Sequence, residues 1–258
     1  MSGAVQISQA GGLARVVLDN PRRRNAVSLT MWDDLARAFA SFGEPDADVR
    51  VVLLRGAEEG NAFSPGADLS EFPELRGTTD KALAYKARTH HALEAIHACP
   101  VPVLALIDGP CIGGGLEIAL AADIRLATPR STFGLPVVRL SNSADLADVR
   151  RLVSAAGASL AAEMLLTAAT LSAERAFAVG LVSWLGPAEA LEQAAQEMAE
   201  RVLAAAPRAV RLAKQALRAG PDDEPAYAEG VRQVLSGADF AEATRAVLEK
   251  RAPNFTGA

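Results

Sequence analysis

A glycine-rich turn followed by a lone acid is the stretch of this sequence most suited to chemistry. Gly109, Gly113, Gly114 and Gly115 follow an apolar run, and Glu117 stands in the first turn of an apolar helical segment. Glycines let the backbone turn sharply and approach another group closely. A loop that opens a helix also directs unpaired N–H groups and the positive end of the helix dipole at whatever lies above it. The stretch is therefore suited to holding an anion or a developing oxyanion.

This stretch does not match the two common phosphate-binding motifs. A dinucleotide fingerprint requires Gly-x-Gly-x-x-Gly after a strand, and a P-loop requires Gly-Lys-Ser/Thr where this sequence has Gly115-Leu116-Glu117. A structural interpretation also stays open, in which the glycines form a tight turn and Glu117 stabilises the helix dipole. The turn alone does not decide between binding and packing.

A second glycine-containing loop follows another apolar strand. The strand is predicted at residues 49–54, and the loop at 56–68 ends in Gly66-Ala67-Asp68 before a short helical stretch. Two loops of this kind could each supply one backbone N–H to a shared oxygen. The elements that must position Glu117 are thus two strands, their turns and the helix after the second turn.

Composition narrows the class of protein. The 258 residues are enough for one large or two small domains with a substantial core. Half of the residues are hydrophobic and 22% are charged, which is typical of a soluble globular protein. The net charge of -5 gives no basic surface for nucleic acid.

The sequence also indicates a compartment. No apolar run is long enough for a membrane span, and residues 1–10 have no signal-peptide pattern. The two cysteines, Cys99 and Cys111, provide neither a disulfide framework nor the spacing of a metal site. We therefore expect a cytoplasmic protein that does not act at a membrane and has no metal centre.

The expected elements divide the chain near Pro187. Alanine-rich segments with helical periodicity follow at 188–206, 208–219, 225–235 and 239–251. We expect a strand-bearing core at residues 1–187 and a helical oligomerisation domain at 188–258, which packs against the core or other subunits. Core strands are expected at 5–7, 13–18, 49–54, 101–107, 124–127, 132–133 and 181–185. Core helices are expected at 30–42, opened by the capping pair Thr30 and Asp33, and at 79–98, 142–155 and 159–168.

Six motifs, in their order and spacing, resemble the enoyl-CoA hydratase/isomerase family of the crotonase superfamily. They are Arg24-Asn25-Ala26, 61–69, 109–117, 122–124, Phe133-Gly134-Leu135-Pro136 and 248–255, and the match covers nearly the whole chain. The resemblance implies an α/β fold, a crotonase-like spiral of ββα units with two stacked sheets, plus a C-terminal helical trimerisation region. It also implies an acyl-CoA-binding catalytic core at 1–187, acyl-CoA thioesters as substrates, no cofactor beyond the coenzyme A of the substrate, and a homotrimer or hexamer.

The resemblance further implies which residues act. The oxyanion hole falls on the backbone N–H groups of Ala67 and Gly114, which would bind the thioester oxygen as it becomes an enolate. Lys250 falls where family members contact a CoA phosphate on a neighbouring subunit. The implied substrate-binding positions are Arg24, Ala26, Ser64, Gly66, Asp68, Leu69, Gly113, Val137 and Lys250.

The sequence departs from the hydratases of the family at the second catalytic acid. Those enzymes use two glutamates, of which the first falls on Glu117, whereas the second position holds Val137. Valine cannot transfer a proton, and the loss of one acid/base group commonly costs about 10²–10⁴ in rate. The Pro-Gly-x-Gly-Gly loop that should follow is also changed, because residues 144–148 read Ala-Asp-Leu-Ala-Asp. Isomerisation therefore fits the residues better than hydration.

Asp145 is a candidate for the missing acid. By ungapped counting from Gly114, it falls where dienoyl-CoA isomerases and ring-epoxide isomerases place a catalytic aspartate. With Glu117 it would form a pair of carboxylates able to move a proton along an acyl chain. Burial in a dry pocket would raise the pKa of a carboxyl group towards the range useful for this transfer. The alternative is a solvated first-turn acid in a helix capped by Asn142 or Ser143. Both interpretations stay open.

A dehalogenase-like chemistry uses the same positions. The 4-chlorobenzoyl-CoA dehalogenases of the family place a nucleophilic aspartate at Asp145 and a histidine base on the helix that here carries His90 and His91. They have glycine in place of Glu117 and tryptophan in place of Val137, and a surface position for His90 is the alternative. His97 is expected to be structural.

The sequence therefore predicts an acyl-CoA enzyme that stabilises a thioester enolate and isomerises or hydrates an enoyl-CoA with Glu117 as acid/base. A catalytically weak acyl-CoA-binding protein is one alternative, because Val137 replaces an expected acid. Hydrolytic or dehalogenating chemistry through Asp145 is the other.

Overall fold

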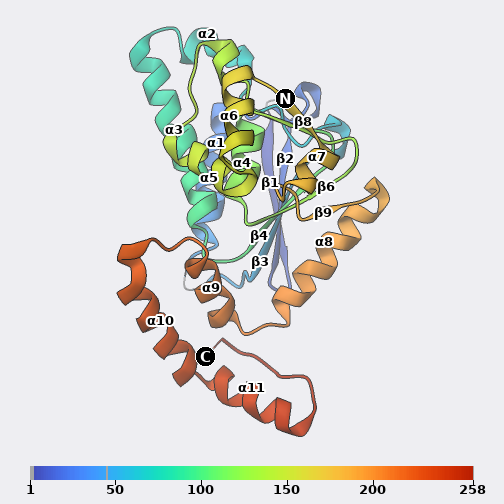
Figure 1. The fold of residues 1–258 in the computed structure, drawn as a ribbon, viewed down its shortest axis with the longest axis vertical. Coiled ribbons are helices and arrows are strands. Elements are labelled where there is room, and N and C mark those ends of the chain that lie inside the picture. The colour runs from blue at the N-terminus through green and yellow to red at the C-terminus, as the bar shows by residue number, and fades with distance from the viewer. Residues whose placement is uncertain (1–2, 45, 258) are drawn as a thin grey trace.

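The computed structural model describes residues 3–44 and 46–257. Its larger sheet has six strands in the order β1-β2-β3-β4-β6-β9. The hairpin of β1 (Ala4–Ala10) and β2 (Leu13–Asp19) opens this sheet (Figure 1). Gly11 and Gly12 join the two strands with positive φ angles, as a two-residue hairpin turn requires. This hairpin confirms the expectation from the sequence.

The rest of the larger sheet is parallel. β3 (Val51–Gly56) pairs with β2 and β4, β4 (Val103–Ile107) with β6, and β6 (Ile124–Ala127) with β9 (Trp184–Leu185). The β3 and β4 sequences are nearly unbroken apolar runs because both faces of these strands are covered. Turns that follow β3 and β4 therefore emerge at the same edge of the sheet.

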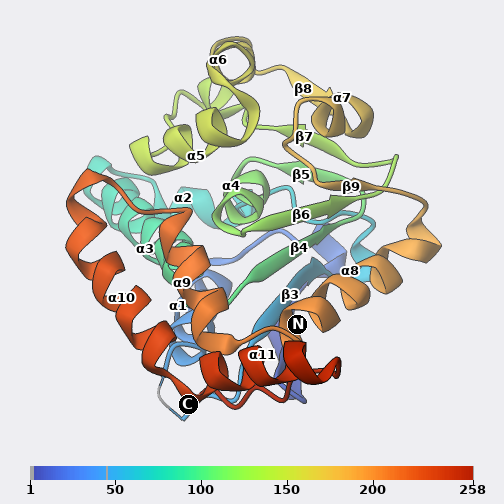
Figure 2. The same cartoon turned by 60° about the horizontal axis from the view of Figure 1, so that its bottom comes forward.

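A smaller sheet of three strands accompanies the first. It consists of β5 (Pro110–Ile112), β7 (Thr132–Gly134) and β8 (Thr170–Ser172) in that order. Figure 2 shows these strands beside β6 and β9 of the larger sheet. Two sheets among many helices confirm the α/β architecture, although the sequence predicted neither β5 nor β8.

The larger sheet lies between two hydrophobic layers, and successive side chains along a strand point into opposite layers. Val52 and Leu54 face the larger layer, which includes α1 (Leu29–Ser41) and α3 (Thr79–Ala98). Val51 and Leu53 face the opposite layer, where α8 (Ala188–Leu203) contributes Leu191, Ala195 and Ala199. This alternation follows from the two-residue period of a strand.

Helix α1 starts one residue before the expected helix. Its N-cap is Ser28, whose hydroxyl accepts a hydrogen bond from the Met31 N–H at 3.3 Å, so the capping pair Thr30 and Asp33 is wrong. Ser28 fits the role because a short side-chain oxygen in extended backbone can reach a free N–H of the first turn. Helix α3 matches its expected bounds.

Short helices complete the core. They are α2 (Phe72–Leu75), α4 (Gly114–Ala121), α5 (Leu146–Ala156), α6 (Ala158–Thr167) and α7 (Ala173–Ala178). Single-turn 3-10 segments lie at η1 (Pro21–Arg23), η2 (Glu58–Gly60), η3 (Leu69–Glu71), η4 (Val137–Leu140) and η5 (Pro221–Asp223). Several of these short elements, including η1, η3 and η4, carry residues of the site described below.

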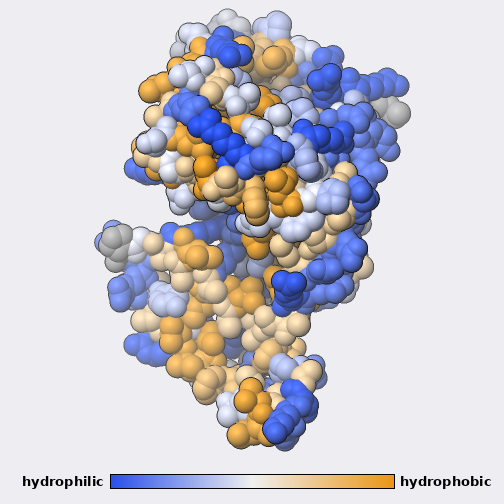
Figure 3. Space-filling model, turned by 45° about the vertical axis from the view of Figure 1, so that its right-hand side comes forward, coloured by the Kyte–Doolittle hydropathy of each residue, from blue (hydrophilic) through white to orange (hydrophobic). Residues whose placement is uncertain are grey.

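The C-terminal helices extend away from the sheets. They are α9 (Pro207–Ala216), α10 (Glu224–Ser236) and α11 (Ala238–Glu249), at the bottom of Figure 1. Figure 3 shows apolar colour over this region, where Leu235, Phe240, Val247 and Leu248 are exposed. Among the residues described, no helix is both long and apolar enough to cross a membrane.

Candidate active site

A cavity of about 1010 Å³ lies where the turns after β3 and β4 meet. Its walls come from η1, from the 65–72 segment, from α3 and from the start of α4. The remaining wall is formed by η4 and by the residues that lead into α5. The cavity brings together most of the positions that the sequence singled out.

The first turn pairs with Val27 in a way that leaves the N–H of Ala67 without a backbone acceptor among the described residues. Val27 N–H donates to Gly66 O at 2.8 Å, and Asp68 N–H donates to Val27 O at 3.0 Å. In this parallel bridge the N–H of the central residue points away from the partner strand. Ala67 lines the cavity.

Ser64 and Gly66 are buried and do not line the cavity, and their expected role in substrate contact stays a prediction. The Ser64 hydroxyl donates to Asn25 O at 2.8 Å and accepts from Gly66 N–H at 3.0 Å, and the residue is fully buried. The side chain therefore fixes the shape of the turn.

The second turn delivers Gly114 as the first residue of α4. Gly113 N–H donates to Gly134 O at 2.8 Å, which anchors the turn on β7. An N–H at the first position of a helix has no intrahelical acceptor. Over residues 3–44 and 46–257, neither the Ala67 N–H nor the Gly114 N–H has a protein acceptor.

The two turns touch through their backbones. A Cβ on Gly66 would lie 2.5 Å from Gly114 N, and a Cβ on Gly115 would lie 2.1 Å from Ser64 O. Any side chain at either position would push the turns apart. Glycine is therefore required for the approach that places Ala67 and Gly114 in one cavity wall.

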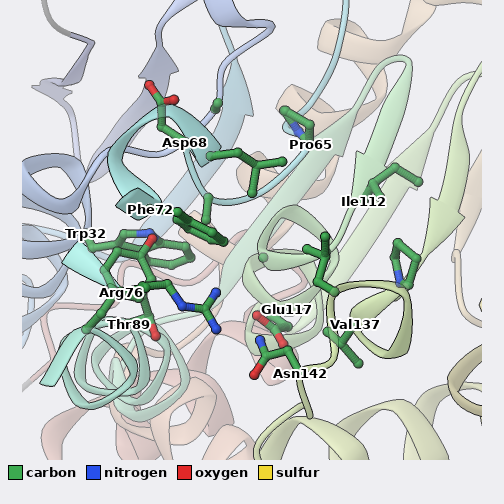
Figure 4. A pocket seen from close by; sticks show the side chains of 18 of the residues that line it. Trp32, Pro65, Asp68, Phe72, Arg76, Thr89, Ile112, Glu117, Val137 and Asn142 are labelled. Atoms are coloured by element: carbon green, nitrogen blue, oxygen red, sulfur yellow. The ribbon is translucent and has the colours of Figure 1, made fainter. Parts of the chain in front are cut away.

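Glu117 reaches the cavity from the first turn of α4. Figure 4 shows its carboxyl group between Val137 and Asn142. Burial, with the nearby carboxylates of Asp148 and Asp145, raises the pKa of Glu117 to about 8, against the opposing charges of Lys86 and Arg151. The side chain is thus mostly a neutral acid at pH 7, and it lines the cavity.

Asp145 is the N-cap residue of α5, but its side chain makes no capping hydrogen bond. Its carboxylate lies 2.8 Å from Lys86 Nζ and 3.5 Å from His90 Nδ1, and it lines the cavity. The alternative of a solvated first-turn acid behind a cap at Asn142 or Ser143 is therefore wrong. The structure places Asp145 in the same cavity as Glu117.

Asp148 is a site residue that the sequence analysis missed. It is almost completely buried, lines the cavity and accepts a hydrogen bond from Arg151 Nη1 at 2.8 Å. Burial raises its pKa, and the charge of Arg151 opposes that rise. The spacing of three from Asp145 was an available signal, since residues three apart share one helix face.

Val137 provides an apolar wall where a second glutamate was missing. It is the first residue of η4, is half-buried against the core and lies beside Glu117 (Figure 4). Asn142 N–H donates to Val137 O at 3.1 Å, which brings the Asn142 side chain to the same part of the cavity.

The other expected positions divide into two groups. Those that line the cavity are Arg24, Ala26, Asp68, Leu69 and Gly113. Asp68 also caps η3 through Ser70 N–H at 3.0 Å and lies 3.5 Å from Arg23 Nε, so it stabilises the wall. Lys250 ends α11 in a left-handed conformation and does not line the cavity of its own chain.

The three histidines have separate environments. His90 is half-buried and faces Asp145, whereas its neighbour His91 is exposed. Burial and the charge of Arg218 lower the pKa of His97 to about 4, and His97 lines a different cavity near α9. Of the three side chains, His90 alone contacts a cavity carboxylate, that of Asp145, although none of them lines the cavity.

Comparison with known proteins assigns the class. The family model described as enoyl-CoA hydratase/isomerase matches residues 8–258, so the chain belongs to the enoyl-CoA hydratase/isomerase family. A solved enoyl-CoA hydratase/carnithine racemase from Magnetospirillum magneticum is similar with a TM-score of 0.91 and 36% identity, covering 100% of this chain and 97% of the other. This similarity confirms the expected crotonase-like fold.

Curated relatives of similar identity have different names. An enoyl-CoA isomerase/hydratase from Mycosarcoma maydis is 33% identical over 95% of this chain and 93% of its own. A methylmalonyl-CoA decarboxylase from Escherichia coli K12 is 30% identical over 98% of both chains. The family assignment therefore establishes an acyl-CoA enzyme type without fixing one reaction.

Proposed function

We propose that this protein isomerises or hydrates an enoyl-CoA through a thioester enolate, with isomerisation as the favoured reaction. The observation that carries the proposal is one cavity wall that combines the acceptor-free N–H groups of Ala67 and Gly114 with the carboxyl group of Glu117. Backbone donors fixed in advance stabilise charge where it develops, and they do so best in a site that excludes water.

The two N–H groups supply the oxyanion hole in this proposal. When a proton leaves carbon next to the thioester carbonyl, negative charge moves onto the carbonyl oxygen. The N–H groups of Ala67 and Gly114 would donate to that oxygen, and the start of α4 adds the positive end of its dipole. Removing one such donor from an enzyme commonly costs about 10²–10³ in rate.

Glu117 moves the proton. As a carboxylate it accepts the proton from one carbon, and as a carboxylic acid it returns the proton to another carbon of the enolate, so that the double bond shifts. A pKa of about 8 suits both roles near neutral pH, because neither form is rare. Asp145 would be the second acid/base group, since its carboxylate also lines the cavity.

Val137 is the reason that isomerisation is favoured over hydration. Adding water requires a group that activates the water while another delivers a proton, and the side chain beside Glu117 at Val137 is apolar. An enolate intermediate needs only an oxyanion hole and a proton carrier, the roles proposed here for Ala67 and Gly114 and for Glu117.

A labelling experiment tests the proposed function. The protein is incubated with enoyl-CoA and saturated acyl-CoA thioesters in D₂O, and products are analysed by mass spectrometry. Movement of the double bond with deuterium uptake supports isomerisation, and a gain of water mass supports hydration. Tight binding of thioesters without turnover would instead support the catalytically weak acyl-CoA-binding protein.

Nucleophilic chemistry is the second candidate, because His90 Nδ1 lies 3.5 Å from Asp145. Asp145 would displace a leaving group such as halide from a carbon of the acyl group, which forms an ester and releases the halide ion. Water would then attack the Asp145 carbonyl carbon of that ester, freeing the hydroxylated product and the carboxylate. Turnover in H₂¹⁸O would therefore place ¹⁸O in the Asp145 carboxylate. The ion pair with Lys86 counts against this candidate, since it lowers the electron density available for attack.

We also propose a homotrimer or hexamer. The exposed apolar residues on α10 and α11 support this, because large apolar patches commonly mark protein interfaces. Lys250 would then contact CoA bound to a neighbouring subunit. Light scattering after size exclusion measures the assembly, and a monomer at micromolar concentration would contradict it.

A further inference from the structure

Arg76 is fixed in the cavity wall by stacking on aromatic rings. It is the C-cap residue of α2, and its Cζ lies 4.3 Å from the centre of the Phe72 ring and 5.8 Å from that of Tyr85. Cation–π contacts of this kind hold a guanidinium while leaving its edge free to donate. In Figure 4 the guanidinium of Arg76 points into the cavity, towards the side that carries Glu117.

The Arg76 guanidinium has no protein partner in the described part of the chain. Over residues 3–44 and 46–257, no carboxylate lies within 4.0 Å of it, and it makes no side-chain hydrogen bond. Other cations of the cavity are engaged, because Lys86 pairs with Asp145 and Arg23 with Asp68. Glu71, an acid on the same side, accepts from Leu29 N–H at 2.8 Å instead.

Burial distinguishes Arg76 from the remaining cavity cations. Arg22, Arg24 and Arg139 are exposed, so water solvates them, whereas Arg76 is half-buried. Within the described residues, the buried hydroxyl of the adjacent Tyr85 also has no protein acceptor. This wall therefore holds donors without acceptors, and such groups stabilise a bound anion more than exposed ones do.

The charges of the cavity have two poles. Glu117 lies on α4, and Asp145 and Asp148 lie at the start of α5. Arg76 follows α2 and stands across the cavity from Glu117 in Figure 4. The carboxylates of Asp145 and Asp148 would repel an anionic group of a ligand, whereas the guanidinium of Arg76 would attract it. Asp68, which pairs with Arg23 of η1, lies in another part of the cavity from Glu117 in Figure 4.

We propose that the acyl group of the substrate carries a carboxylate, which Arg76 binds while Glu117 acts on the carbons near the thioester. This inference rests on the proposed function, because it needs a thioester in the oxyanion hole. The substrate class is thus a monothioester of coenzyme A with a dicarboxylic acid. Guanidinium and carboxylate match in shape and form paired hydrogen bonds. The acyl chain would therefore lie with its carboxylate at Arg76 and its thioester in the oxyanion hole.

Calorimetric binding measurements test this inference. The probes are malonyl-, succinyl-, glutaryl- and adipyl-CoA, each compared with the methyl ester of its free carboxylate. We expect the wild-type protein to bind the acid of at least one chain length about 10-fold to 100-fold more tightly than its ester. The substitution Arg76→Met should remove this preference and leave the affinity for the ester unchanged, while Arg76→Lys should restore part of it.

Two controls separate the possible sources of the anion. Free coenzyme A and dephospho-CoA report on the phosphates, and a loss of affinity for them in Arg76→Met would overturn the inference by assigning Arg76 to coenzyme A. Arg139→Met removes an exposed guanidinium of the same cavity. If that variant loses the preference for the acid and Arg76→Met keeps it, the inference is also wrong.

The outcome is distinguishable from failure of the proposed function. If the wild-type protein binds none of the thioesters, neither acids nor esters, the proposed function itself is overturned. If it binds esters as tightly as acids at every chain length, the acyl-CoA site stands and the assignment of Arg76 is wrong.

Discussion

Asp145 and Lys86 form an ion pair of 2.8 Å that joins the start of α5 to α3 in the cavity wall. Both side chains are partly exposed, at 24% and 35%. Pairs of this kind contribute only about 0–1 kcal/mol to stability. A change at Asp145 therefore tests chemistry more than folding.

The first prediction concerns this pair. We expect Asp145→Asn to lower turnover by about 10-fold to 100-fold, since a second acid/base group is lost. The free energy of unfolding, measured in urea, should fall by no more than about 1 kcal/mol. Unchanged turnover would show that Asp145 is not catalytic.

The second prediction concerns Glu117. We expect Glu117→Gln to keep the shape of the side chain and lower turnover by at least about 100-fold, because the amide cannot carry the proton. Calorimetry should show thioester affinity within a few-fold of the wild type. A variant that turns over at the wild-type rate would refute the assignment of Glu117.

The third prediction concerns stability and pH. The pKa of Glu117 is raised from its ordinary value of 4.5 to about 8, so the folded state holds a proton that the unfolded state loses. Its contribution to stability is complete below about pH 4.5, decreases as pH rises, and is lost above about pH 8. Urea denaturation across this range should show a fall in the wild-type protein and a smaller one in Glu117→Gln.

The fourth prediction restores an acid. Val137→Glu places a carboxyl group beside Glu117, so we expect hydration of an enoyl-CoA to rise by at least about 10-fold. Val137→Gln is the matched control, because it has similar size and no acid. Equal hydration rates in the two variants would show that the missing acid at position 137 does not limit hydration.

The fifth prediction concerns the contact of the two turns. In Gly115→Ala the new Cβ would meet the backbone oxygen of Ser64 at 2.1 Å, and a backbone atom cannot move cheaply. We expect a loss of stability of about 1–3 kcal/mol together with most activity. Gly220→Ala is the control, since its nearest neighbour lies at 3.8 Å and its φ is negative. A fully active Gly115→Ala variant would contradict the proposed hole.

Much of the fold follows from the sequence where patterns are long. The bounds of α3 match the expected 79–98, because a 20-residue helix has a cap at Thr78 and a clear end before Pro100. The strands β5 and β8 have three residues each, too few to show a period. Their place depends on pairing with β7, which only the folded chain reveals.

The sequence predicts those parts of the site that lie in contiguous motifs. The two turns and Glu117 are contiguous motifs, so the sequence indicates them directly. Asp148 and Arg76 belong to the site through the packing of α5 and α2 against the cavity, which no local pattern encodes. Ser64 shows the reverse case, since the side chain of a residue inside a motif bonds to the backbone.

Asp123 links α9 and the residues that follow it to the larger sheet. Its carboxylate lies 2.6 Å from Lys214 Nζ and 2.5 Å from Arg218, and it also accepts from Val103 N–H at 2.7 Å. Lys214 is itself buried and donates to Val101 O at 2.5 Å. A version of the protein shortened before α9 would leave this acid without its cations, next to the strand that leads into the glycine turn. We therefore expect that loss of α9 to α11 disturbs the start of β4, the strand that leads into the turn carrying Gly114.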